Sequence, residues 1–188
     1  MLEWSLFVAN GQSYPKPINA AKHAINDFAE RLAAQFSFAP GDPIEPLVRR
    51  LGGHVVVKNP VAFTGQKPES IIVRSASDFT IFVPGMTSIE RDRFTIAHEL
   101  GHLFLHFPAF SQANPGVDMV ATRWVDESDK DQQRAEWEAN WFAAGFIMPS
   151  SAFKAVYGET GGDVRALAVR FGVSQSAAEI RAKTFGLV

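Results

Sequence analysis

The stretch Arg93–Phe107 reads RFTIAHELGHLFLHF, and its pattern indicates which further side chains must come from other parts of the chain. Two histidines, His98 and His102, stand four residues apart, with Glu99 directly after the first. On an α-helix, residues with this spacing lie about 40° apart around the axis, so both imidazoles project from one face. The residues around them are mostly apolar, and burying two imidazoles and a carboxylate there is costly without a partner. The pattern therefore predicts a metal site.

The chemistry of such a site is set by the residue types available. The chain contains no cysteine, so any metal must be held by histidine and carboxylate. Zn²⁺ held by two histidines polarises a carbonyl group and lowers the pKa of its water, and a neighbouring carboxylate takes and then delivers the proton. We therefore predict that His98 and His102 bind Zn²⁺ and that Glu99 is the catalytic general base.

The third histidine of the stretch, His106, continues the four-residue spacing. On a straight helix its side chain lies about one turn beyond His102, too far to share a tetrahedral ion. A longer motif with Gly and a further His is absent, since Phe107 and Pro108 stand where that histidine would fall. We interpret His106 as a histidine at a helix end, near the negative end of the helix dipole.

A third metal ligand is expected in the segment AEWEANWFAAGFIMP, residues 135–149, which offers Glu136 and Glu138. On a helical wheel, Glu136 falls inside the apolar, core-facing stripe, whereas Glu138 falls near its edge. A carboxylate in that stripe needs a cation, so Glu136 is the predicted third ligand. The alternative is a buried glutamate paired with an arginine such as Arg91.

Other positions of this segment support the same arrangement. Asn140, one turn after Glu136, is a candidate for hydrogen bonding to a metal ligand or for contact with the substrate. The small residues Ala139 and Ala143 would allow this helix to approach the HExxH helix closely.

The order of expected elements indicates an α+β fold without repeats or a domain boundary, so we expect one domain, 1–188, with a helix-turn-helix-like subregion at 161–188. Thr87 and Glu90 have the spacing of a capping box, which predicts that the HExxH helix begins there and runs to about His106. Residues 107–130 are expected to be mostly irregular. The remaining expected elements are helices at 17–37, 44–51, 130–148 and on either side of Gly172, and strands at 54–58, 71–75 and 78–85.

Composition limits the classes of function. A formal net charge of -2 and a pI of about 6.2 do not favour a nucleic-acid-binding protein. The first residues, MLEWSLFVANG, lack the basic and apolar regions of a signal peptide, and no apolar run approaches the length of a membrane span. We therefore expect a soluble, cytoplasmic protein that does not bind membranes.

DRFTIAHELGHLFLH, followed by EWEANWFAAGFIMP, resembles the ImmA/IrrE family of zinc metallopeptidases. The resemblance implies a gluzincin-like fold, with a small mixed or antiparallel sheet packed on helices and the active-site helix beneath its edge strand. It also implies His98, His102 and Glu136 as ligands, Glu99 as the base, and cleavage of XRE-type helix-turn-helix repressors in mobile elements, stress responses or toxin–antitoxin-like pairs. Strand 78–84 would be the edge that holds a substrate peptide.

A second hypothesis comes from LAVRFGVSQSAAEIR, whose Ala168 and Gly172 have helix-turn-helix spacing, so the chain could itself be a DNA-binding regulator. Its second helix offers Gln175, Ser176, Arg181 and Lys183, but the excess of positive charge over residues 161–188 is small. We favour a packing or partner-docking role for these helices. A third hypothesis, a catalytically inactive binding fold, is disfavoured by the intact Glu99. Neither tyrosine, Tyr14 or Tyr157, is placed near the metal by the sequence.

Overall fold

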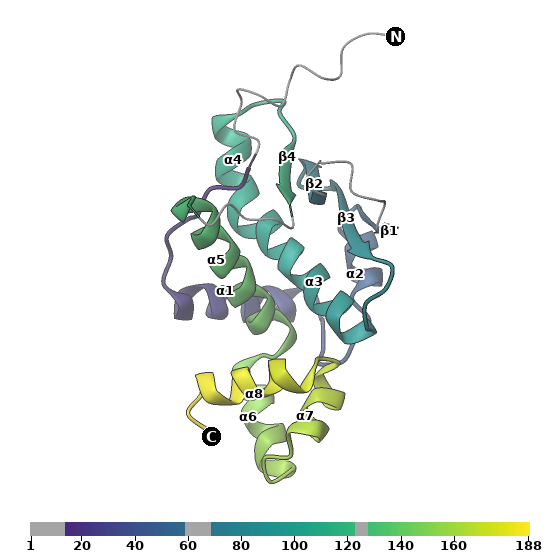
Figure 1. Ribbon diagram of the computed structural model, residues 1–188, viewed down its shortest axis with the longest axis vertical. Coiled ribbons are helices and arrows are strands. Elements are labelled where there is room, and N and C mark those ends of the chain that lie inside the picture. The colour runs from purple at the N-terminus through teal and green to yellow at the C-terminus, as the bar shows by residue number, and fades with distance from the viewer. Residues whose placement is uncertain (1–13, 59–68, 123–127) are drawn as a thin grey trace.

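The computed structural model describes residues 14–58, 69–122 and 128–188, and it shows helices packed against one face of a small sheet (Figure 1). The predicted α+β class is confirmed. The N-terminal stretch 1–11, in which a signal peptide was not expected, lies outside the described residues. Within those residues, no helix combines the length and the apolar character that crossing a membrane requires.

The sheet is mixed, and its strand order is β1-β3-β2-β4. β1 (Gly53–Lys58) runs parallel to β3 (Asp78–Pro84), while β2 (Glu69–Ser75) runs antiparallel to both β3 and β4 (Met119–Thr122). The prediction that strand 78–84 forms the sheet edge is therefore wrong, because β3 pairs on both sides. Its almost continuous apolar sequence, DFTIFVP, is typical of a strand buried between neighbours. The other neighbour of β2 is β4, which forms one edge of the described sheet.

The HExxH helix begins one residue later than the capping box predicted. Its N-cap is Ser88, whose hydroxyl accepts a hydrogen bond from the Arg91 backbone N–H at 3.3 Å. The Thr87 hydroxyl instead donates to the carbonyl of Pro84. α3 (Ile89–Gly101) therefore starts with a serine cap, one residue after the threonine that the capping box predicted.

Helical structure continues beyond α3 and overturns the expectation of an irregular segment at 107–130. A π-helix, η1 (His102–His106), leads directly into α4 (Phe107–Ala113), and β4 follows. Pro108 lies in the first turn of α4, where its fixed φ suits a helix, so it does not end the helical structure. β4 exists through its pairing with β2, which is distant in sequence. Residues 123–127 of this segment lie outside the described part.

α5 (Lys130–Ile147) lies between α1 (Lys22–Gln35) and α3 (Figure 1). Asp129 caps its N-terminus by accepting from two backbone N–H groups. Gly101 faces Ala139 so closely that a Cβ on this glycine would lie 3.0 Å from the Ala139 Cα. The predicted close approach of the two helices is therefore present, and a glycine on α3 permits it as much as the alanines of α5.

The C-terminal helices pack at the opposite end of the molecule from β4 (Figure 1). α8 carries Arg181 into the interior. Arg181 is only 2% exposed, and it donates to the Met148 carbonyl at 3.0 Å and to the Glu30 carboxylate at 3.2 Å. It cannot contact DNA, as the helix-turn-helix hypothesis required, because α8 uses it to attach to the core. The remaining helices are α2 (Glu45–Arg50), α6 (Ser150–Glu159), α7 (Val164–Phe171) and α8 (Gln175–Thr184).

Candidate metal centre

Three side chains from separate elements bring their ligand atoms together. His98 comes from α3, His102 is the first residue of η1, and Glu136 comes from the second turn of α5. The two Nε2 atoms of the histidines are 3.1 Å apart. The Glu136 carboxylate lies 3.1 Å from the His98 Nε2 and 3.3 Å from the His102 Nε2. The three ligands predicted from the sequence therefore meet at one point.

These distances suit a zinc ion. In a tetrahedral site with bonds of about 2.0–2.1 Å, two ligand atoms are about 3.3 Å apart, which is close to the three separations here. Among the described residues, this is the one group of three or more histidines, aspartates and glutamates whose ligand atoms converge in this way. Two histidines and one carboxylate leave a fourth position for water or substrate, as in catalytic zinc sites.

The tautomer of His98 is set by Asn140. The Nδ1–H of His98 donates to the Asn140 Oδ1 at 3.0 Å, which leaves the Nε2 lone pair for the metal. Asn140 therefore occupies the position expected for it, behind a ligand and one helical turn after Glu136.

Glu99 is buried, and its Oε2 accepts a hydrogen bond from the Ser70 hydroxyl at 3.0 Å. Ser70 belongs to β2, so the sheet orients the carboxylate that stands next to the metal ligands. The sequence did not indicate Ser70, because a single serine in a strand carries no pattern and the contact spans 29 residues.

The burial of the two glutamates on α5 is the reverse of what the helical wheel predicted. The Glu138 side chain is 0% exposed, whereas that of Glu136 is 24% exposed. The helical wheel located the apolar stripe of α5, but neighbouring elements cover this helix on more than one side. Glu136 lies on the side that faces the candidate metal site. Glu136 does not pair with Arg91, which is exposed, and the arginine that binds a glutamate here is Arg134, with its Nε 3.1 Å from the Glu138 Oε1.

Comparison with known proteins places this centre in a family. Residues 73–183, which contain both ligand segments, match the model of the IrrE N-terminal-like domain, peptidase M78. The chain belongs to this peptidase family. The resemblance to ImmA/IrrE proteins is thereby confirmed, and the chain carries a metallopeptidase-like domain.

One solved structure supports the fold at lower similarity. A Mycobacterium tuberculosis transcriptional regulator aligns with a TM-score of 0.56 and 18% identity, over 83% of this chain and 45% of the other. At that identity the likeness shows the fold alone, and this chain spans less than half the length of that protein. No curated protein matches the sequence.

When the M78 site holds no metal, its histidines and glutamates shift one another's pKa values. Burial by itself lowers the pKa of His98, but hydrogen bonding to Glu136 and the charges of Glu99 and Glu136 outweigh it and raise the pKa to about 9. Burial lowers the pKa of His102 to about 4. Burial raises the pKa of Glu136, but hydrogen bonds and charge interactions with both histidines together outweigh it and lower the pKa. Below about pH 9, His98 of the metal-free site therefore carries a second proton on its Nε2, opposite the Glu136 carboxylate.

His106 does not lie at a helix end, because η1 continues into α4. It is 1% exposed, and its Nδ1 lies 3.0 Å from the His102 Nδ1. Its Nε2 lies 3.1 Å from the Glu138 Oε2. Burial raises the pKa of Glu138, but hydrogen bonds from His106, the Ile18 N–H and Arg134 more than offset this and lower it. The interpretation of His106 as a helix-end histidine was therefore wrong: it lies inside continuous helical structure and contacts His102 and Glu138.

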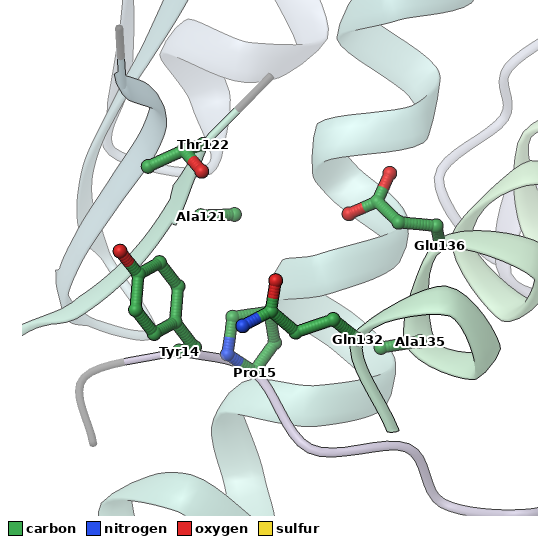
Figure 2. A pocket seen from close by; sticks show the side chains of 7 residues that line it. All are labelled: Tyr14, Pro15, Ala121, Thr122, Gln132, Ala135 and Glu136. Carbon is green, nitrogen blue, oxygen red and sulfur yellow. The ribbon is translucent and has the colours of Figure 1, made fainter. Parts of the chain in front are cut away.

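A small pocket adjoins the metal ligands and is lined by the N-terminal segment, β4 and α5 (Figure 2). Tyr14 lies opposite Glu136 across this space, so the fold brings one tyrosine beside the candidate site. The other, Tyr157, donates its hydroxyl to the Leu187 carbonyl at 2.7 Å and serves the C-terminal packing. The lining residues are Tyr14, Pro15, Ala121, Thr122, Gln132, Ala135 and Glu136.

Proposed function

We propose that this chain is a zinc-dependent endopeptidase that cleaves a partner protein, an XRE-type helix-turn-helix repressor, and thereby relieves repression in the cytoplasm. The observation that carries the proposal is the convergence of His98, His102 and Glu136 beside the buried carboxylate of Glu99. A site that only stored a metal would not need this fourth group. Membership of the M78 peptidase family supports the same reaction class.

His98, His102 and Glu136 would hold the ion, and the ion when bound would polarise the scissile carbonyl and acidify water. The Glu99 carboxylate would take a proton from the attacking water and deliver it to the leaving amine. Ser70 holds the Glu99 Oε2 and so limits rotation of this carboxylate. Asn140 and Glu136, both on α5, keep His98 facing the site.

The substrate segment would lie extended along β4, which takes the role first expected of β3. β4 is the terminal strand of the described sheet, and its Ala121 and Thr122 line the same pocket as Glu136. Backbone groups of a terminal strand can pair with an added peptide strand. Since only an extended segment can pair in this way, cleavage is expected in a linker or loop of the repressor.

The alternative is a DNA-binding regulator that uses α7 and α8. The exposed basic residues there are Arg165, Arg170 and Lys183, set against Asp163 and Glu179, because Arg181 is buried. DNA binding needs contacts between several basic side chains and the phosphates, so this surface by itself is poorly suited to bind DNA. The name transcriptional regulator belongs to the structural neighbour and is no evidence that this chain binds DNA. We favour a partner-docking role for α7 and α8.

The experiment is to mix the zinc-loaded protein with purified repressor-like proteins encoded beside its gene and to map any cleavage by mass spectrometry. Glu99→Gln is the matched control, because it keeps the size of the side chain and leaves all three ligands in place. It should retain zinc and lose cleavage by about two to four orders of magnitude. Normal cleavage by Glu99→Gln, or tight salt-sensitive DNA binding with no cleavage of any such repressor, would reject the proposal.

A further inference from the structure

A buried chain of hydrogen-bonding groups runs from the metal site into the protein behind His102. The His102 ring contacts the His106 ring through their Nδ1 atoms at 3.0 Å. His106 then reaches the Glu138 Oε2 through its Nε2 at 3.1 Å. All three side chains are 0% exposed. The proposed reaction uses only His98, Glu99, His102 and Glu136, so it gives no role to His106 or Glu138.

Only one arrangement of protons satisfies every contact when a metal is present. The Glu138 carboxylate can only accept, so the His106 Nε2 carries a proton and donates it. The His106 Nδ1 is then a lone pair, which accepts from the Nδ1–H of His102. The His102 Nε2 is in turn left unprotonated and faces His98 and Glu136, where a metal binds. The carboxylate thus determines, through two rings, which nitrogen of His102 is available.

Glu138 is itself held in place by two further donors. Its Oε2 also accepts from the Ile18 N–H at 2.9 Å, and its Oε1 accepts from the Arg134 Nε at 3.1 Å. Arg134 also donates to the Ala20 carbonyl at 2.5 Å. The carboxylate is therefore fixed by α5 and by the segment that precedes α1, so it cannot rotate away from His106 without losing these bonds.

We propose that His106 and Glu138 are positioning residues for the metal ligand His102: they fix its tautomer and ring orientation so that its Nε2 faces the ion. The inference rests on the metal-binding part of the proposed function, and it makes no claim about the substrate. Groups that hydrogen-bond to histidine ligands commonly contribute about 10- to 100-fold to metal affinity. His106 follows His102 by four residues, the spacing that also brings the rings of His98 and His102 together.

The test is the zinc affinity of the full chain, measured by competition with a chromophoric chelator. His106→Leu removes both ring nitrogens and should weaken zinc binding by about 10- to 100-fold. His106→Asn places an amide oxygen near the position of the Nδ1 atom, so it can still accept from His102 and should recover most of that loss. Leu105→Ala is the matched control on the same turn: it should lower stability towards urea and leave zinc affinity unchanged.

A second measurement keeps the inference testable if His106→Leu does not fold. Nitrogen-15 NMR of the zinc-loaded wild-type protein should show a proton on the Nδ1 of His102 and on the Nε2 of His106. A proton on the Nδ1 of His106 would overturn the inference. So would a folded His106→Leu protein with zinc affinity within about threefold of the wild type, since the expected loss is tenfold or more.

These outcomes are separable from failure of the proposed function. If the wild type binds zinc and His106→Leu weakens it, but no repressor is cut, the positioning role stands and the endopeptidase proposal falls. If His98→Ala abolishes zinc binding while His106→Leu has no effect, the metal site stands and the positioning role falls.

Discussion

Gly101→Ala should test how tightly the two ligand-bearing helices must pack. Gly101, the last residue of α3, lies between Glu99 and His102, and its partner Ala139 lies between Glu136 and Asn140 on α5. A Cβ at position 101 would meet the Cα, carbonyl oxygen and Cβ of Ala139 at 3.0, 3.2 and 3.3 Å. The Cα separation falls short of ordinary carbon contact by about 0.5 Å. Because two of the three atoms are backbone, α5 must move as a unit.

The expected cost follows from two opposing contributions. Overpacking of this kind costs about 1–3 kcal/mol, and the better helix propensity of alanine offsets about 0.5–1 kcal/mol of it. We therefore expect Gly101→Ala to lower the free energy of unfolding of the metal-free protein by about 1–2 kcal/mol. Separating α3 from α5 also separates His98 from Glu136, so zinc affinity should fall by about tenfold or more.

The assays are urea unfolding without metal and zinc competition with a chelator. Gly158→Ala is the matched control, since Gly158 lies in α6 and a Cβ there has no neighbour within 4 Å. It should raise stability by about 0.5 kcal/mol and leave zinc binding unchanged. If Gly101→Ala instead gains stability like Gly158→Ala and binds zinc normally, the close packing of α3 on α5 does not set the geometry of the site.

Three further predictions concern the site itself. Because the pKa of His98 in the metal-free protein is raised to about 9, zinc binding at pH 8 should release about 0.9 proton from this group, measurable by calorimetry in buffers of different ionisation enthalpy. The same shift stabilises the metal-free fold fully below about pH 6.5, and this contribution should be lost as the pH rises through about 9; a flat stability profile from pH 6.5 to 9 with no proton release would contradict the assignment. Ser70→Ala should leave zinc affinity unchanged and lower kcat for repressor cleavage, since Glu99 loses the bond that orients it; unchanged kcat would show that Ser70 is not needed. Tyr14→Phe should also lower kcat with zinc content intact, because the phenol borders the pocket beside Glu136 and can donate to the charge that develops on the substrate carbonyl oxygen; turnover equal to that of the wild type would remove Tyr14 from the mechanism.

The ligand set was predictable because it depends on local periodicity. His98 and His102 share a helical face whenever residues 98–102 are helical, and Glu136 was identified from the same reasoning applied to α5. That reasoning chose the glutamate whose carboxylate lies beside both histidines, but it misjudged burial, since a wheel drawn for one helix does not show how many neighbours cover it. Glu138, judged to lie near the edge of the stripe, is completely buried because the segment before α1 crosses over it.

The sequence by itself predicted the α+β class, the family, and the grouping of His98, His102 and Glu136, because these depend on local patterns and short-range spacing. Tertiary structure alone decided which strand ends the sheet, because strand order depends on pairing between distant segments such as β2 with β4. It also decided the roles open to Ser70, His106 and Tyr14, whose partners come from other elements. His106 is the clearest case: helical structure continues past it through η1 into α4, and its contact with Glu138 on α5 extends the metal centre into the core.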